Sequence, residues 1–367
     1  MHSICIRNSF AIRQTLFLTY QSTQTTSPFH SHLVNYRFSS SNSNSTPQKR
    51  SVNNLFKQFR QLLHHYFLGS KLLFSNYKQT KLIREQKMPL RLTRPDRNLL
   101  TQFRSDLIVG IPFISLFMAP IIGYTAPLLA FIAPRYLPST LITPNQKSSF
   151  VLNDSVVSSE IVQSLINQFD TNYDDEMFKN VIPLRQCVEE LLSSKIDSIN
   201  FLTSSIPLLI SSFESYPLSS FSREHLLLLH RSLVHSSFIA EYVLTKNQLI
   251  NSLEQWKEKI TYDDYLLTKG KENLNELTSS DLVQTLYDRG LYLHPQEMAQ
   301  VLQQEQNRLL TNMKKKRDMN EIISEPSTNL VKEWQQLLST WLKLYKNNNI
   351  PTSLLVHLGP FLTTKKR

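Results

Sequence analysis

The longest apolar stretch of the chain covers residues 107–134, where no charged side chain occurs. About 20 consecutive apolar residues suffice for a helix to cross a bilayer, so this stretch can span one with some tilt. Pro112, Pro120 and Pro127 predict kinks roughly on one face, and membrane helices tolerate such prolines. We expect a single span at about residues 107–134, and the alternative is a re-entrant or interfacial hairpin broken near Gly123.

A second apolar pattern precedes this stretch. Large apolar residues recur at steps of three and four between residues 52 and 84, with Lys57 and Arg60 between them. This spacing predicts a basic amphipathic helix within residues 51–88. Such a helix lies on an anionic membrane surface or packs on a neighbouring domain, and the sequence leaves both alternatives open.

Helical patterns with intervening loop signals continue behind the apolar stretch. One apolar stripe predicts a helix over residues 155–169 that begins at Asp154. The chain contains only 6 glycines, which argues against β-hairpins and glycine-rich nucleotide loops because both need glycine in their turns. We therefore expect a mainly α fold, with a single-span membrane segment followed by an all-helical domain.

Two segments of this domain look like copies of one unit. Residues 221–233 and 277–291 each begin with an apolar residue, then a Ser or Thr N-cap, an acidic residue and leucines at helical spacing. The second segment ends in Arg289 and Gly290, a helix C-cap signature. Short helix–loop–helix units of this kind often serve as docking modules.

The positive charge is concentrated at the N-terminus. The formal net charge is +11, and the Lys and Arg residues that precede the first acidic residue, Glu85, account for all of it. Residues 1–50 are rich in Ser, Thr, Asn and Gln and lack acids, as organelle transit peptides do. Arg37, followed by Phe38 and Ser39, resembles a matrix-peptidase site. We expect a mitochondrial transit peptide; a plastid address and a disordered Ser-rich terminus are the alternatives.

The sequence contains no pattern for catalysis, metal binding or cofactor binding that we can name. Cys5 and Cys187 lie too far apart for a disulfide framework or a zinc site. His225, His230 and His235 recur every five residues, which spreads them around a helix and away from a common metal. No nucleophile elbow, phosphate loop or catalytic carboxylate pair occurs. We expect a protein that is not an enzyme, with no cofactor and no small-molecule substrate.

One dense basic run interrupts the otherwise balanced C-terminal part. It consists of Lys314, Lys315, Lys316 and Arg317. These side chains could contact RNA phosphates or anionic lipid head groups. The alternative is a solvated turn, because three acidic residues follow within residues 318–325 and balance the charge.

Several motifs, in order along the chain, resemble those of the LETM family of mitochondrial inner-membrane proteins. They are LTRPDR at 92–97, QFRSD at 102–106, RYLPST at 135–140, DDYLLTKG at 263–270, the Arg-Gly pair of 277–291, WLKL at 341–344 and IPTSLL at 350–355. The resemblance extends from about residue 88 to about residue 360. It implies that the C-terminal part is the family's ribosome-binding-like domain.

We accordingly divide the chain into four parts. They are a transit peptide at 1–50, the basic amphipathic segment at 51–88, the LETM-type box with the span at 89–146, and the helical domain at 147–367.

Two departures from the longer family members affect the expected function. Those members add coiled coils and an EF-hand, which this chain up to Arg367 does not have, so it is most similar to the short members. They also carry a glutamate within the membrane segment, where this chain has Gly123. An intramembrane carboxylate is a natural carrier for proton-coupled exchange. The nearest acidic side chain here is Asp106, at the expected membrane edge.

The resemblance implies three functions. The first, which we expect, is a membrane tether whose matrix domain docks on the mitochondrial ribosome, through rRNA or ribosomal protein, or on an assembly factor, and supports the biogenesis of inner-membrane complexes. The second is a role in mitochondrial potassium–proton or calcium–proton exchange and volume homeostasis, which would require a homo-oligomer because one span cannot enclose a pore. The third is shaping of the inner membrane.

The expected partners are the mitochondrial ribosome and inner-membrane lipids. The candidate phosphate contacts are Arg231, Arg289, Lys314, Lys315, Lys316 and Arg317. Two observations predict opposite orientations of the chain in the membrane. Basic residues are more frequent before the span than after it, so the positive-inside rule places the N-terminal side in the matrix. The family places the C-terminal domain there, and we follow the family.

Overall fold

The computed structural model describes residues 52–87, 92–118, 134–171, 207, 209–235, 240–269, 274–314, 326–347 and 349–363. The regular elements within these ranges are helices, so the expected mainly helical fold is confirmed for them. Val52–Arg367 form one compact unit. The predicted transit peptide at 1–50 lies outside the described residues, and the boundaries at 88 and 146 stay predictions.

The α-helices follow one another along this unit with short 3-10 helices between some of them. The α-helices are α2 (Val52–Lys87), α3 (Arg94–Met118), α5 (Pro144–Thr171), α8 (Arg223–Val234), α9 (Ala240–Val243), α10 (Lys246–Lys269), α11 (Ser279–Tyr287), α12 (Pro295–Lys314), α13 (Thr328–Asn347) and α14 (Thr352–Thr363). The 3-10 helices are η2 (Pro134–Tyr136), η4 (Leu218–Ser220) and η5 (Leu274–Glu276).

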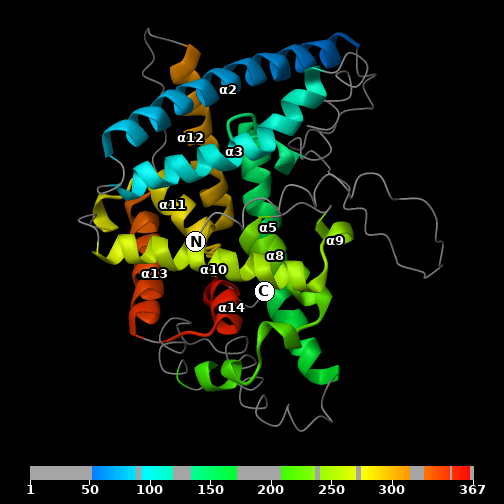
Figure 1. The fold of residues 1–367 in the computed structure, drawn as a ribbon, viewed down its shortest axis with the longest axis vertical. Helices are drawn as coiled ribbons and strands as arrows, with labels where there is room; N and C mark the ends of the chain where they lie inside the picture. Colours follow the sequence, from blue (N-terminus) through cyan, green and yellow to red (C-terminus); the bar gives the residue numbers. More distant parts are fainter. Residues whose placement is uncertain are drawn as a thin grey trace, which may run out of the picture. The chain divides into compact units, whose positions relative to one another are not determined.

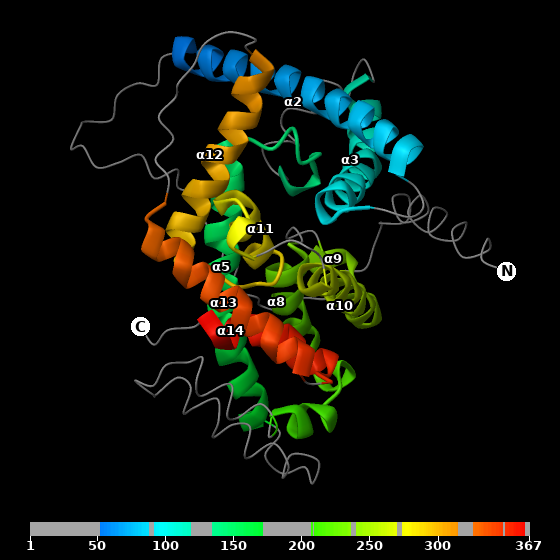
Figure 2. The ribbon, with the colours of Figure 1, turned by 90° about the vertical axis from the view of Figure 1, so that its left-hand side faces the viewer.

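The pair α5 and α12 makes the most extensive contact between described helices. Both ribbon views show the two helices side by side (Figures 1 and 2). The helix α5 also contacts α8 and α14, and α10 packs against both of these. At the top of Figure 1, α2 crosses the end of α12 and contacts α3.

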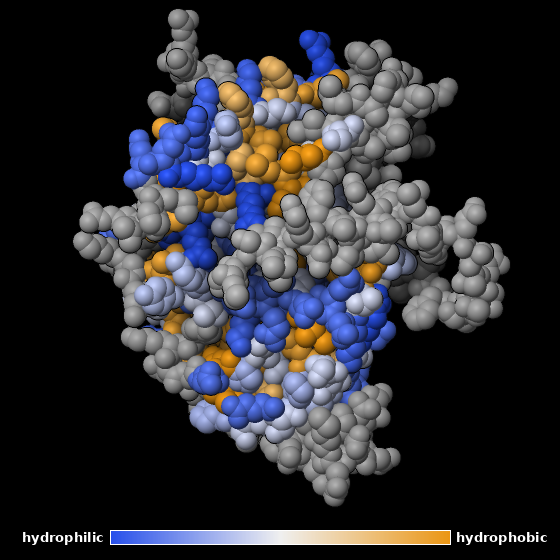
Figure 3. All heavy atoms as spheres, viewed as in Figure 1, coloured by the Kyte–Doolittle hydropathy of each residue, from blue (hydrophilic) through white to orange (hydrophobic). Residues whose placement is uncertain are grey.

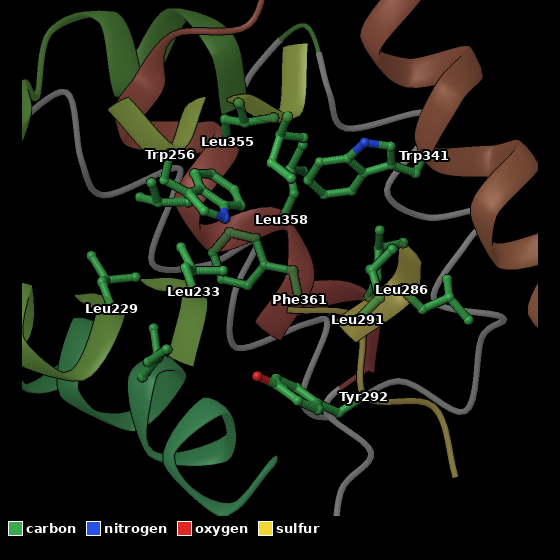
Figure 4. Close-up of a cluster of buried hydrophobic side chains, with 14 of the residues drawn as sticks. Leu229, Leu233, Trp256, Leu286, Leu291, Tyr292, Trp341, Leu355, Leu358 and Phe361 are labelled. Atoms are coloured by element: carbon green, nitrogen blue, oxygen red, sulfur yellow. The ribbon is translucent and has the colours of Figure 1, made fainter. Parts of the chain in front are cut away.

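The helix α14 lies in the middle of the apolar core. Every residue from Ser353 to Leu362 is buried, and a helix that is apolar on all sides is stable only inside a protein. Figure 4 shows Phe361 of α14 close to Leu233 of α8 and Trp256 of α10. Burial of each such side chain contributes about 1.5–3 kcal/mol. This core therefore joins helices that are far apart in the sequence.

Local capping signals fix where several helices begin. Ser222 caps α8 by accepting from the His225 N–H, and Thr278 caps α11 by accepting from the Asp281 N–H. Both predicted N-caps are thus confirmed. Satisfying an otherwise unpaired N–H in this way stabilises a helix by about 1 kcal/mol.

The prediction that a helix begins at Asp154 is wrong. The helix α5 begins at Pro144, where Thr143 and Gln146 form a capping box. The Thr143 N–H donates to Gln146 Oε1 over 2.9 Å, and the Gln146 N–H donates to Thr143 Oγ1 over 3.3 Å. Asp154 lies in the middle of α5 and is 3% exposed. Its carboxylate is used for tertiary contacts and caps no helix.

The predicted amphipathic helix is present as α2, and one of its faces packs on the domain. Leu68, Leu72 and Ile83 on this face are buried. His65 Nε2 lies 3.1 Å from the Leu141 carbonyl oxygen. Gly69 lets the backbone approach Thr140 so closely that a Cβ would overlap the carbonyl oxygen there. The packing alternative is therefore confirmed, and the opposite face of α2 remains exposed.

The first part of the predicted span belongs to α3, which contains Pro112 and ends at Met118. Gly123, Pro120 and Pro127 lie outside the described residues. Among the helices that the structure describes, none has the length and apolarity needed to cross a membrane.

The turn after α11 has the predicted C-cap geometry. Gly290 adopts φ +69°. Its N–H donates to the Tyr287 carbonyl, and the Leu291 N–H donates to the Leu286 carbonyl, each over 3.0 Å. These paired bonds form a Schellman motif, which needs a residue with positive φ at this position.

Two buried histidines form a hydrogen-bonded chain across the core. His357 Nδ1 must donate to the Ser353 carbonyl, because a carbonyl only accepts. His357 Nε2 therefore accepts from His225 Nε2–H over 2.8 Å. His225 Nδ1 in turn accepts from the Ser164 hydroxyl over 2.9 Å. The chain needs both rings neutral, since a proton on His357 Nε2 would place two donors face to face, and a proton on His225 Nδ1 would remove the acceptor of the Ser164 hydroxyl.

We predict that Gly359→Ala destabilises the protein by about 2 kcal/mol, within the range for overpacked cores. A Cβ on Gly359 would lie 2.7 Å from the Gly290 carbonyl oxygen and 2.8 Å from that of Arg289. Glycine to alanine in a free helix has the opposite sign, by about 0.5–1 kcal/mol. Guanidinium unfolding followed by tryptophan fluorescence measures the change.

Gly110→Ala is the matched control for this substitution. A Cβ there would meet only the Pro138 Cγ at 3.2 Å, and a side-chain atom moves more easily than a backbone carbonyl. We expect a change within about 1 kcal/mol. Equal stability of Gly359→Ala and the wild-type protein would contradict the close packing of α14 on the α11 turn.

We also predict that the protein loses stability between pH 7 and pH 5. Burial lowers the pKa of His230 and of His357 to about 4, and burial together with His357 lowers the pKa of His225 well below its ordinary value. The unfolded chain then binds protons below about pH 6.5 that the folded chain does not bind. The free energy of unfolding is therefore highest above that pH, where these histidines are neutral in both states, and it declines as the pH falls toward 4.

The expected loss by pH 5 is up to about 2 kcal/mol for each of these histidines. Urea unfolding at the two pH values measures it, and His357→Gln should reduce the difference because one titrating group is gone. An unfolding free energy that is unchanged from pH 7 to pH 5 would refute the prediction.

Candidate functional site

Four charged side chains from α3, α10 and the turn after α11 meet inside the unit. Arg94 at the start of α3 donates to Asp263 of α10 through Nε and Nη2, over 2.7 and 3.1 Å. Arg289 follows α11 and donates to Asp263 over 2.8 Å. It also donates through Nε to Asp264 over 3.0 Å. Arg94, Asp263, Asp264 and Arg289 therefore form one network, which we call the buried ion cluster.

Neutral groups complete the buried ion cluster. Trp341 of α13 donates its indole N–H to Asp264 over 2.9 Å. Thr285 accepts from Arg94 over 2.7 Å, and its hydroxyl donates to the Asp281 carbonyl. The cluster thus connects α3, α10, α11 and α13. Each charge has an opposite charge within hydrogen-bond distance, which is the condition for keeping charges away from water.

The charges in the cluster stabilise one another. Burial alone raises the pKa of Asp263, but the hydrogen bonds and charges of Arg94 and Arg289 outweigh burial and lower it. Burial disfavours the Arg289 guanidinium, yet Asp264 and Asp263 raise its pKa. The charged forms of Asp263 and Arg289 are therefore favoured, whereas burial raises the pKa of Asp264 although Arg289 and Trp341 oppose this shift. Because the carboxylates of the cluster already accept strong donors, the cluster is suited to holding helices together and not to acid–base chemistry.

A second polar cluster joins η2 to the domain. Arg135 of η2 pairs with Asp154, and its Nη1 donates to the His235 carbonyl over 2.8 Å. The same carboxylate accepts from Tyr287 over 2.7 Å and from His235 Nδ1 over 3.1 Å. The rings of His235 and Tyr287 stack with centroids 4.0 Å apart. The positive φ of His235, 56°, turns its ring toward this cluster at the end of α8.

Both clusters use α11 and both flank the apolar stretch. Arg94 precedes it and reaches Thr285, whereas Arg135 follows it and reaches Asp154, which Tyr287 also contacts. The chain before the apolar stretch therefore contacts α11 directly, and the chain after it is linked to α11 through Asp154 of α5.

Asp106 connects the two sides directly. Its carboxylate is 4% exposed and accepts from the Ser139 N–H over 2.6 Å and from the Ser139 hydroxyl over 2.8 Å. Gln102 also donates to the Ser139 hydroxyl over 2.8 Å. Asp106 thus fixes the turn that follows η2, a role that the sequence did not indicate.

The structure changes the set of candidate phosphate contacts. Arg289 is 0% exposed and bound to two carboxylates, which removes it from that set. Arg231 lies in the last turn of α8 and is partly exposed. Lys314 is the last residue of α12, and Lys315, Lys316 and Arg317 lie outside the described residues.

The histidines singled out in the sequence have separate partners. His225 binds His357, His230 Nε2 lies 3.0 Å from the Ser252 hydroxyl, and His235 binds Asp154. Across the described ranges, no group of three or more His, Cys, Asp or Glu side chains could hold a metal ion.

One feature of the sequence indicates both clusters: each contains an aspartate that lies on the apolar face of a helix. Asp264 occupies a position on the apolar stripe of α10, four residues after Ile260 and three before Leu267. Asp154 likewise lies on the stripe of α5, three residues after Val151. A carboxylate on the buried face of a helix requires a cationic or hydrogen-bonding partner. This position predicts a partner without identifying it.

We predict that Arg289→Gln destabilises the protein by about 3–5 kcal/mol, because it leaves Asp263 and Asp264 buried with fewer donors. Adding Asp264→Asn should recover part of the loss, since the double variant buries one charge fewer. Guanidinium unfolding measures both variants.

Arg97→Gln is the matched control. Arg97 stacks at 3.3 Å over the ring of Tyr262, which is 45% exposed. Its loss should cost no more than about 1 kcal/mol. A similar effect of both arginine substitutions would contradict the special role of Arg289.

Comparison with known proteins identifies the family. Residues 92–331 match the family model described as "LETM1-like, RBD". This range contains Arg94, Asp263, Asp264 and Arg289 and so includes the whole charged part of the buried ion cluster. No curated protein and no solved structure matches the chain significantly. Because the family model matches more than half of the sequence, the chain belongs to the LETM1-like, RBD family.

Proposed function

We propose that the chain is a mitochondrial inner-membrane protein whose helical domain lies in the matrix and docks on the mitochondrial ribosome or on an assembly factor. The observation that carries this proposal is the match of residues 92–331 to a model of the LETM1-like ribosome-binding domain. The transit-peptide composition of residues 1–50 supports the location. In this role the chain supports the synthesis and assembly of inner-membrane complexes.

The architecture suits a tether. Residues 107–134 attach the chain to the membrane, either by crossing it once or by returning to the same face. On each side of them an arginine, Arg94 or Arg135, ties the chain to the buried part of the domain. A force between the membrane and a bound particle would therefore act on the folded core.

Cation–proton exchange, the second function implied by the resemblance, finds no support at Asp106. Both of its carboxylate oxygens accept hydrogen bonds from Ser139, and its position is explained by the turn that it fixes. We therefore do not propose this function.

Co-sedimentation with mitochondrial ribosomes tests the proposal. Replacing Lys314, Lys315, Lys316 and Arg317 with serine should reduce the bound fraction strongly if these residues contact rRNA phosphates. The affinity should also depend less steeply on salt: the negative slope of log affinity against log salt should become smaller in magnitude by about 3, because fewer counterions are released.

The matched control removes the same charge elsewhere. Lys246, Lys259, Lys332 and Lys343 lie on α10 and α13, and their replacement with serine should leave binding nearly unchanged. An equal loss in both variants would indicate unspecific attraction between a basic protein and RNA. Absence of wild-type co-sedimentation at physiological salt would refute ribosome docking.

A further inference from the structure

The two ends of the apolar stretch lie next to each other. The Ser139 backbone N–H donates to Asp106 Oδ1 over 2.6 Å, although all of residues 107–134 lie between these two residues along the chain. A Cβ on Gly110 of α3 would lie 3.2 Å from the Pro138 Cγ. A helix that crosses a bilayer once leaves its ends about 30 Å apart. These contacts are therefore incompatible with a single crossing between Gly110 and Pro138.

The clusters on either side require the same conclusion. Arg94 and Arg135 both reach side chains in contact with α11, so the chain before and after the apolar stretch belongs to one folded body. Arg289 and Asp154 cannot give up these partners without leaving charges buried and unpaired, at a cost of several kcal/mol. A bilayer cannot separate the two sides while both clusters are intact.

The surface where α3 leaves this body is nevertheless suited to lipid. Leu107, Ile108 and Ile111 of α3 are 39%, 50% and 61% exposed. Large aliphatic side chains exposed together mark a site for an apolar partner.

The outer face of α2 is suited to the head groups of a membrane. Phe67 and Phe74 are each 58% exposed, and the ammonium groups of Lys71 and Lys78 lie 4.4 and 4.8 Å from the centroids of their rings. Glu85 is the only acidic residue within α2. Along the upper edge of Figure 3, where α2 lies, hydrophobic side chains project between hydrophilic ones. Aromatic residues interleaved with lysines are typical of helices that lie on anionic lipid.

We infer that the chain enters and leaves the membrane on the same face, so that α2, the start of α3 and the helical domain all lie on the matrix side. The hairpin alternative considered for the sequence thus replaces the single span. This arrangement also removes the conflict over topology. The basic residues before the apolar stretch satisfy the positive-inside rule while the C-terminal domain lies in the matrix as in the family.

Cysteine labelling of the full-length chain in mitoplasts tests this inference. Cys5 and Cys187 are first replaced with serine, which leaves a chain without cysteine. Single cysteines then replace Ser70, Thr101 or Ser149, which are exposed residues of α2, α3 and α5. A membrane-impermeant maleimide is added before and after detergent.

We expect all three cysteines to be protected in intact mitoplasts and labelled after detergent. A single span predicts instead that Ser149→Cys differs from Ser70→Cys and Thr101→Cys, and that result would overturn the inference. Labelling of all three before detergent would overturn the matrix placement.

Alkaline carbonate extraction separates a hairpin from a peripheral protein. The chain should stay in the membrane pellet, and its release would overturn insertion into the membrane. The inference refines the membrane attachment of the proposed function, but neither readout depends on ribosomes. Ribosome docking and the placement of both flanks on one face of the membrane can therefore fail independently.

Discussion

The burial of Arg289 is the constraint on which the arrangement of the helices depends. A guanidinium that is fully removed from water loses several kcal/mol of hydration, and only carboxylates placed at hydrogen-bond distance offset that loss. Asp263 and Asp264 meet this requirement as neighbours on α10, and Trp341 and Arg94 satisfy their remaining acceptors. The relative positions of α3, α10, α11 and α13 are therefore set by charge as well as by apolar packing. The turn at Gly290 holds Arg289 in place for this role.

Local features of the fold could be predicted from the sequence, and long-range ones could not. The caps at Ser222, Thr278 and Gly290 depend on residues within one turn, so short motifs were sufficient. Asp154 shows the limit of this approach, because a carboxylate before an apolar stripe has the same local pattern whether it caps a helix or binds a distant arginine. Arg94 and Asp263 are 169 residues apart, and no periodic pattern connects them. The basic run at 314–317 is evident from the sequence. A binding surface cannot be predicted in this way, because the sequence does not say which basic side chains are exposed and which, like Arg289, are buried.

The membrane segment illustrates the same distinction. Apolarity and length follow from composition, and they indicate that residues 107–134 prefer lipid. Whether a chain crosses or turns back depends on what its ends bind. Here one carboxylate, Asp106, and one serine, Ser139, carry that information. Hydropathy analysis weighs each residue by its transfer energy and has no means of representing such a bond.

The sequence separation within the buried ion cluster also bears on the order of assembly. In the proposed import, which begins at the N-terminus, Arg94 enters long before Asp263 and Arg289, so the start of α3 has no ionic partner until most of the chain has followed. Contacts of such long range form late, because closing the intervening loop costs entropy before any stabilisation is gained. The apolar stretch that follows Arg94 is thus free to meet lipid first. The helical domain would then assemble at the membrane surface, around a segment that is already inserted.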